Sequence, residues 1–156
     1  MTALRVEPRR GQMIALAHVP PVLTYCVHGE AYLVPRPSGE LLIGATVEDA
    51  GFQRAVTAEG IGSLLRSAIE LVPSVRELPI ARTWCGFRPW APDSLPVLGP
   101  WPGIGGLFVA TAHFRNGILL APITARLMTE WMTTGRPSLD VDEFLPDRFS
   151  ARPTAR

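Results

Sequence analysis

Two segments of this chain carry residues that could bind an anion, and the first is centred on Arg88. Residues 86–93 (GFRPWAPD) are apolar and stiffened by proline, apart from this arginine and the terminal Asp93. An arginine is costly to bury in such a segment without an anionic partner. Its planar guanidinium matches a carboxylate through two parallel hydrogen bonds, so Arg88 could bind a carboxylate substrate. Alternatively, Arg88 pairs with Asp93 or another carboxylate of the chain, and the residues leave both alternatives open.

The second segment covers residues 110–122, which read ATAHFRNGILLAP. The pattern predicts a buried strand, a polar tight turn and an apolar helix, in that order. The start of a helix presents unpaired backbone N–H groups and a partial positive charge, which suit a phosphate or a delocalised anion. Asn116 and Gly117 are expected to let those amides converge on one point. The competing interpretation is an ordinary capped helix beside a surface arginine, Arg115.

A tyrosine adds a hydrogen-bonding group of a different kind. In residues 31–36 (AYLVPR), strand alternation places Tyr32 and Val34 on one face. The Tyr32 hydroxyl could hydrogen-bond a substrate carboxylate. A half-buried tyrosine with a purely structural role fits the same pattern.

Motifs of other chemistries are missing from the sequence. There is no G-x-S-x-G elbow, no P-loop and no pair of carboxylates at catalytic spacing. His18, His28 and His113 lie on different segments without metal-ligand spacing, and neither Cys26 nor Cys85 belongs to a CxxC motif. The sequence therefore offers anion-binding groups but no candidate for general acid–base or nucleophilic catalysis.

Composition narrows the class of protein. The 156 residues are 47% hydrophobic with a formal net charge of +1, which argues against a disordered chain and against nucleic-acid binding. No apolar run approaches the ~20 residues that a membrane-spanning helix needs, and residues 1–10 contain no apolar stretch typical of a signal peptide. We therefore expect one cytoplasmic domain without membrane or nucleic-acid partners.

Hydrophobic periodicity and turn residues predict the elements that must position these groups. Residues 57–72 have apolar side chains at helical spacing behind Thr57 as N-cap and before Pro73. A second helix is expected from near Ile118 to Met132 with Gly135 as C-cap, and Pro122 leaves its first residue open. Strands are predicted over residues 11–19, 32–36, 41–47, 80–90 and 107–110. This order predicts an α+β fold with a mostly antiparallel sheet and flanking helices.

Several segments together resemble the C-terminal half of glycine oxidases, flavin-dependent enzymes of the D-amino acid oxidase family associated with thiamine biosynthesis. The resemblance covers residues 5–149, and residues 150–156 are expected to be a disordered tail. The segments that carry it are Arg10-Gly11-Gln12, YLVPR at 32–36, LLIGATVEDAGF at 41–52, WCGFRPWAPDSLPVLGP at 84–100 and HFRNGILLAP at 113–122.

The resemblance implies a fold and a reaction. The fold would be the substrate-binding and flavin-capping domain of these flavoproteins, without their N-terminal Rossmann domain for FAD. The reaction would be hydride transfer from the Cα of glycine or a related amine to the flavin, followed by hydrolysis of the imine and release of hydrogen peroxide. It would need no catalytic side chain, in agreement with the missing acid–base groups.

The resemblance also implies roles for individual residues. Arg88 would bind the substrate carboxylate, Tyr32 would hydrogen-bond it, Arg115 would face the substrate and Val47 would form part of the pocket wall. Ala112 stands where the family usually has glycine. The residues expected to line the flavin are His113, Phe114, Arg115, Asn116, Gly117, Ile118 and Leu119.

The FAD site would be incomplete in this sequence, because it contains no G-x-G-x-x-G turn after a strand. We therefore expect a flavin-binding N-terminal half or partner chain, and no oxidase activity from this chain alone. Residues 107–110 would return to the flavin domain, so apolar surface is expected there. The alternatives are a non-catalytic remnant or small-carboxylate binding module, and an oxidase for sarcosine or a D-amino acid.

Overall fold

The computed structural model describes residues 4–17 and 22–149 of the chain. The residue His18 and the tail of residues 150–156 lie outside the described residues. The chain forms two compact units, one of residues 9–87 and the other of residues 88–149 with residues 4–8. Each unit is considered by itself below.

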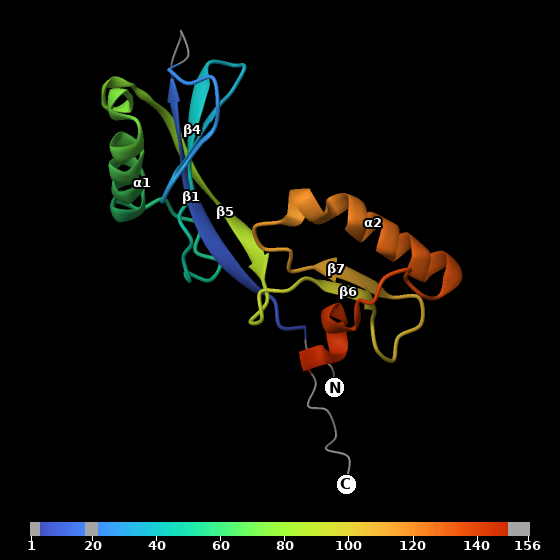
Figure 1. Ribbon diagram of the computed structural model, residues 1–156. Helices are drawn as coiled ribbons and strands as arrows, with labels where there is room; N and C mark the ends of the chain where they lie inside the picture. Colours follow the sequence, from blue (N-terminus) through green and yellow to red (C-terminus); the bar gives the residue numbers. More distant parts are fainter. Residues whose placement is uncertain (1–3, 18–21, 150–156) are drawn as a thin grey trace. The chain divides into compact units, whose positions relative to one another are not determined.

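The unit of residues 9–87 is built on a five-stranded sheet in the order β2-β3-β4-β1-β5 (Figure 1). The pairs β1/β4, β3/β4 and β2/β3 are all antiparallel. A tight turn joins β3 to β4, with Gly39 at φ 86° and a hydrogen bond from the Arg36 N–H to the Glu40 carbonyl at 2.8 Å. The strands are β1 (Glu7–Ala17), β2 (Val27–His28), β3 (Tyr32–Pro35), β4 (Glu40–Gly44) and β5 (Ile80–Trp90).

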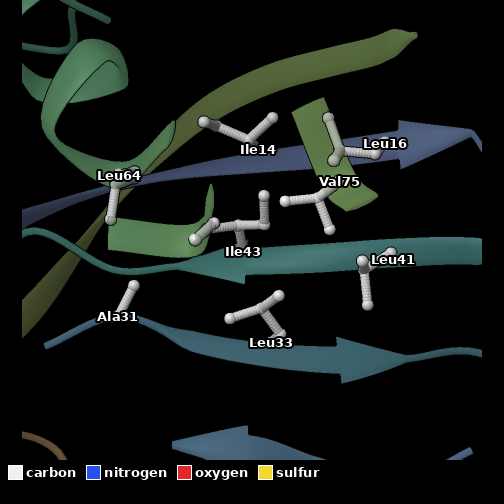
Figure 2. Close-up of a cluster of buried hydrophobic side chains, with 9 residues drawn as sticks. Ile14, Leu16, Ala31, Leu33, Leu41, Ile43, Leu64 and Val75 are labelled. Carbon is white, nitrogen blue, oxygen red and sulfur yellow. The ribbon is translucent and has the colours of Figure 1, made fainter. Parts of the chain in front are cut away.

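Helix α1 (Ala58–Leu71) covers one face of this sheet. The Thr57 side chain caps it by accepting from the Gly60 N–H at 3.1 Å, a contact worth about 1 kcal/mol. Leu64 and Ala68 of the helix are buried, and η1 (Pro73–Glu77) follows directly and adds Val75. Figure 2 shows Leu64 and Val75 next to the buried side chains of the sheet and of Ala31, which directly precedes β3. The strands contribute Ile14, Leu16, Leu33, Leu41 and Ile43.

The unit of residues 88–149 has a two-stranded antiparallel sheet of β6 (Val97–Pro100) and β7 (Phe108–Thr111) packed against helix α2 (Gly117–Thr134). Leu98 of β6 packs with Leu127, Met128 and Trp131 of the helix. The chain continues through the short helices η2 (Asp142–Phe144) and η3 (Pro146–Phe149). Gly135 ends α2 in the left-handed conformation at φ 78°, as its position predicts.

Helix α2 begins at Gly117, so Pro122 lies inside it rather than in its first turn. Proline has no N–H, so the carbonyl of Ile118 loses its partner four residues on. Because Ile118 is among the most exposed residues of the chain, water can take the place of that partner.

The predicted fold class is confirmed, since the pairs β1/β4, β3/β4, β2/β3 and β6/β7 are antiparallel and helices flank the sheets. The strand expected over residues 41–47 ends as a regular element at Gly44. The short strands β2 and β6 were not predicted, because β2 spans only two residues and Gly99 in β6 has φ 121°. Among the described residues, no helix is long and apolar enough to cross a membrane.

Candidate functional site

The loop between β7 and α2 has an unusual backbone. Ala112 and Phe114 both have positive φ angles, of 60° and 50°, which side chains other than glycine rarely adopt. Such residues cluster at functional sites, where the surroundings hold them in place. The expectation that Asn116 and Gly117 would supply this freedom was wrong, because Asn116 has φ −106° and Gly117 begins the helix. The reversal occurs earlier, at Ala112.

The two anion-binding segments singled out in the sequence lie side by side. The Phe114 N–H donates to the carbonyl of Pro89, the residue after Arg88, at 3.0 Å. Phe114 can make this bond because its left-handed conformation turns its amide back from the end of β7. Strand β5 therefore presents Arg88 next to the loop that leads into α2.

Asp93, the alternative partner considered for Arg88, is bound by another arginine. Arg148 donates to the two carboxylate oxygens of Asp93 at 2.7 and 3.1 Å. This bidentate pair lowers the pKa of Asp93 despite its partial burial. Both oxygens of Asp93 are thus engaged by Arg148, and Arg88 itself is half-buried.

His113 is held against helix α2. Its Nε2 lies 2.9 Å from the Thr124 hydroxyl, and burial lowers its pKa, so the neutral imidazole is favoured near pH 7. With Phe108, Ala110 and Met128, it lines an open, mainly apolar groove of about 510 Å³ between β7 and α2. Leu107 and Ala110 are exposed beside it, in line with the apolar surface expected there.

The N-terminus of α2 is open. The Asn116 side chain makes no capping hydrogen bond, and Ile118 and Leu119 are 94% and 78% exposed. Arg115, directly before this end, is exposed as well. The first-turn amides and the arginine together make this end of the helix electropositive.

Tyr32 and Val47 belong to the unit of residues 9–87. Tyr32 alternates with the core residue Leu33, so its side chain lies on the sheet face opposite α1. Its hydroxyl donates to the Met13 sulfur at 3.9 Å, and sulfur is a weak acceptor.

A bulge after β4 decides where Val47 points. Met13 pairs with Gly44, and Arg10 bridges to Glu48. The segment from Gly44 to Glu48 therefore contains one residue more than the segment from Arg10 to Met13 that it pairs with, which is a β-bulge. Glu48 turns toward the side chains of Arg10 and Gln12. Val47, the residue before it in an extended segment, therefore faces the other way and is 49% exposed.

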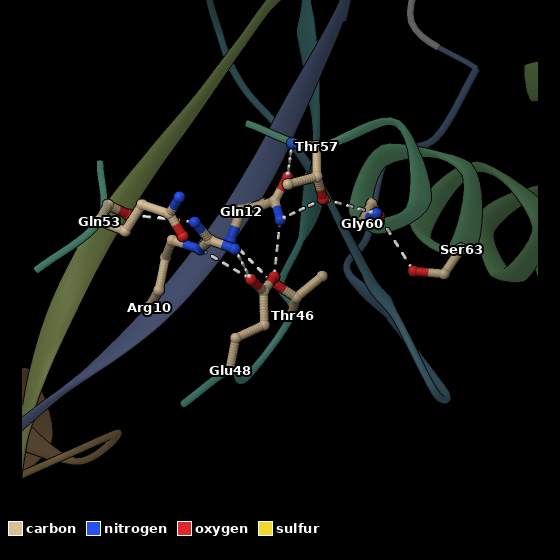
Figure 3. A network of polar contacts seen from close by, with 8 residues as sticks. All are labelled: Arg10, Gln12, Thr46, Glu48, Gln53, Thr57, Gly60 and Ser63. Carbon is tan, nitrogen blue, oxygen red and sulfur yellow. Dashed lines mark hydrogen bonds and ion pairs between the residues drawn. The ribbon is translucent and has the colours of Figure 1, made fainter. Parts of the chain in front are cut away.

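A buried polar network holds this bulge in place (Figure 3). Arg10 forms an ion pair with Glu48 through two nitrogens, one at 2.7 Å, and donates to the Gln53 carbonyl at 3.1 Å. Gln12, which is fully buried, donates to Glu48 at 2.7 Å and accepts from the Thr57 N–H at 2.8 Å. The network ties the start of α1 to strand β1 and to the segment that carries Val47.

The network also lowers the pKa of Glu48. Burial alone would raise the pKa of Glu48, but hydrogen bonds from Thr46, Arg10 and Gln12 outweigh it and keep the pKa below its usual value. Sequence reasoning missed this network as a physical feature. The only signal was the pair of polar residues Arg10 and Gln12 on the buried side of an otherwise apolar strand.

The structure thus groups the candidate residues into two sets. Arg88 and residues 113–119 are in the unit of residues 88–149, joined through the Phe114–Pro89 hydrogen bond. Tyr32 and Val47 belong to the other unit, with Tyr32 on the sheet face opposite α1 and Val47 exposed. No group of three or more side chains suited to a metal ion occurs among the described residues.

Comparison with known proteins identifies the class of this chain. Residues 1–131 match the family of FAD dependent oxidoreductases, and the chain belongs to that family. Its relatives include the glycine oxidase of Pseudomonas putida, which is 37% identical over 145 residues, or 92% of this chain and 40% of the relative. The hydrogen cyanide synthase subunit HcnC of Pseudomonas protegens is 36% identical over 97% of this chain and 36% of its own length.

A solved structure agrees with this assignment. The crystal structure of glycine oxidase from Geobacillus kaustophilus superposes with a TM-score of 0.87 and 37% identity, covering 94% of this chain and 40% of that one. The chain therefore resembles part of a glycine oxidase in fold as well as in sequence. It spans about 40% of the length of these relatives.

Proposed function

We propose that residues 5–149 form the substrate-binding and flavin-capping part of an FAD-dependent oxidase for glycine or a related small amino acid. Family membership and the named glycine oxidases support this proposal. The observation that carries it is the Phe114–Pro89 hydrogen bond, which links the residue after Arg88 to the loop before the open N-terminus of α2. This link supports a shared role for Arg88 and the electropositive helix end in binding an anionic ligand.

Arg88 binds the substrate carboxylate in this proposal, through the bidentate geometry that a guanidinium allows. The place of Arg88 beside the loop that leads into α2 supports this role. Tyr32 donates a hydrogen bond to a substrate carboxylate in this proposal, and this carboxylate is a stronger acceptor than the Met13 sulfur that the hydroxyl meets in the structure. The exposed Arg115 faces the substrate, and Val47 limits the size of its side chain.

The residues around the start of α2 fit one end of a flavin. FAD, when bound, supplies an acceptor for the hydride that leaves the substrate Cα, and dioxygen finally carries the electrons away as hydrogen peroxide. The uncapped first-turn amides stabilise negative charge at this position, and the neutral His113 keeps the loop fixed to Thr124. The cofactor-lining residues in this proposal are His113, Phe114, Arg115, Asn116, Gly117, Ile118 and Leu119.

Adenine and pyrophosphate binding falls to a flavin-binding portion other than residues 5–149. The relatives are about two and a half times as long as the matched region, which supports this division. The exposed groove between β7 and α2 offers apolar surface for that portion.

An anaerobic titration tests the proposal. The chain is mixed with FAD and a separately expressed flavin-binding part of a glycine oxidase, and glycine is added while the flavin absorbance is followed. We expect the oxidised flavin to bleach, and Arg88→Ala to raise the glycine concentration needed by at least about tenfold, because a charge-assisted bond contributes about 1.5–3 kcal/mol.

Arg82→Ala is the matched control, because Arg82 lies in the same strand but is bound to Glu40 at 3.0 Å. It should leave the titration unchanged. The chain without the flavin-binding part should release no peroxide. If the mixture, and a covalent fusion of the two parts, stay oxidised while the chain is folded, the chain is a remnant or a small-carboxylate binding module instead.

A further inference from the structure

Tyr32 lies in a row of residues that crosses three strands. Tyr32 of β3 is directly opposite Gly44 of β4, and Gly44 is directly opposite Met13 of β1. The neighbouring row on these strands, Leu33, Ile43 and Ile14, is buried against α1 (Figure 2). Because side chains alternate between the faces, the row of Tyr32 lies on the face opposite α1.

The Tyr32 ring lies across the backbone of Gly44. Its hydroxyl reaches over β4 to the sulfur of Met13, 3.9 Å away. A Cβ atom at Gly44 would stand 2.4 Å from the Tyr32 Oη and 2.5 Å from its Cζ, distances that real Cβ atoms essentially never show. A side chain at position 44 is therefore incompatible with this orientation of the tyrosine.

The need for glycine at this position is steric. Gly44 is not among the residues with positive φ, so the backbone itself would accept another amino acid. The three nearest atoms to the added Cβ all belong to the outer end of Tyr32. A methyl group would consequently displace the ring and its hydroxyl and leave the strand pairing in place.

We propose that Gly44 is a positioning residue that sets the direction of the Tyr32 hydroxyl and thereby the binding of a small amino acid carboxylate. This inference rests on the proposed function for its ligand, whereas the orientation of Tyr32 stands on the geometry alone. A residue larger than glycine turns the ring away from the sheet, so that the hydroxyl no longer points where it would bind a carboxylate.

Fluorine NMR tests the positioning without any ligand. The chain has only two tyrosines, so incorporation of 3-fluorotyrosine labels Tyr32 and Tyr25 alone, and Tyr25 is 82% exposed. We expect Gly44→Ala to move the Tyr32 resonance by more than its line width and to leave that of Tyr25 in place. Gly105→Ala is the control, because a Cβ there meets nothing within 4 Å. An unchanged Tyr32 resonance in Gly44→Ala overturns the proposal.

A double variant shows whether any loss of stability in Gly44→Ala comes from the clash with the Tyr32 ring. If Gly44→Ala lowers the melting temperature, Gly44→Ala combined with Tyr32→Ala should recover to the level of Tyr32→Ala, because the clashing ring is gone. A double variant as unstable as Gly44→Ala would place the clash elsewhere and overturn the proposal.

The anaerobic glycine titration tests the positioning role of Gly44 separately from the oxidase proposal. In a mixture that bleaches with the unsubstituted chain, Gly44→Ala should raise the glycine concentration needed by about tenfold, the effect of one hydrogen bond to a charged group. Adding Gly44→Ala to Tyr32→Phe should change nothing further, since the hydroxyl is already absent. An unaltered titration for Gly44→Ala overturns the positioning role. Failure of the unsubstituted chain to bleach overturns the oxidase proposal and, with it, the carboxylate ligand.

Discussion

At the scale of single residues, two arginines have clear structural roles. Arg10 is 5% exposed and is held by Glu48 and the Gln53 carbonyl, and Arg148 is held by Asp93. Arg88 is half-buried next to a loop with two left-handed residues, and Arg115 is exposed at the open end of a helix. The substrate-binding roles of Arg88 and Arg115 are proposals that rest on the chemistry of the guanidinium group.

Glu48→Gln should destabilise the unit of residues 9–87 by about 3 kcal/mol, because it leaves the guanidinium of Arg10 buried without a counter-charge. Urea unfolding measures this loss. Glu59→Gln is the control: Glu59 pairs with Arg66, but both side chains are more than half exposed, so the change should cost less than about 1 kcal/mol. Equal losses in the two variants would show that the buried network adds no more than a surface pair.

At the scale of elements, the turn into α2 combines two unfavourable local features. Ala112 and Phe114 adopt left-handed backbone, and Pro122 interrupts the hydrogen bonds of the first turns. The buried packing of Ala112 against Ala91 and Val97, together with the Phe114–Pro89 bond, holds the turn. The cost of Pro122 to the helix is offset further along, where the burial of Leu127, Met128 and Trp131 against β6 stabilises α2.

Pro122→Ala should therefore stabilise the unit of residues 88–149. Proline inside a helix is about 3 kcal/mol less favourable than alanine. Replacing it also makes the unfolded chain more flexible, which lowers the stability of the fold by up to about 1 kcal/mol. We therefore expect a net increase of about 2 kcal/mol in the free energy of unfolding. Thermal unfolding followed by circular dichroism measures the gain. Pro137→Ala lies beyond the C-cap Gly135 and should bring no gain. An unchanged or lower melting temperature for Pro122→Ala would contradict this account of the helix start.

At the scale of the whole molecule, carboxylates with lowered pKa values tie stability to pH. Hydrogen bonds from Arg126 and Ser138 lower the pKa of Glu130 to about 2, and the pKa values of Glu48 and Asp93 are lowered as well. A carboxylate whose pKa is lower in the folded state stabilises the fold above its unfolded pKa. That contribution is lost as the pH falls through the folded value. Acid is therefore expected to weaken both units.

The melting temperature should fall as the pH drops from roughly 5 to 2, the interval between the unfolded and folded pKa values of Glu130. Glu130→Gln should flatten this dependence for the unit of residues 88–149, because the substituted side chain does not titrate. The exposed Glu143 supplies the control substitution Glu143→Gln. A dependence that remains as steep in Glu130→Gln as in the unsubstituted chain would contradict the assignment.

The sequence by itself determined the longer elements. Helix α1, strand β5 and the Gly135 C-cap lie where periodicity and capping residues predicted them, because these signals depend on neighbours within a few positions. Alternation along β3 also predicted that Tyr32 and Val34 share one face of the strand. The suitability of Arg88 and of the α2 N-terminus for anions followed from side-chain and backbone chemistry.

Only the tertiary structure decided which groups meet. Arg10 and Glu48 are 38 positions apart, and Asp93 and Arg148 are 55 apart, so no local pattern reveals either pair. The bulge that turns Val47 outward and the passage of the Tyr32 ring over Gly44 depend on strand register. The left-handed turn at Ala112 depends on the packing around it. Register and packing are set by the whole core at once, and for that reason they appear only when the chain is folded.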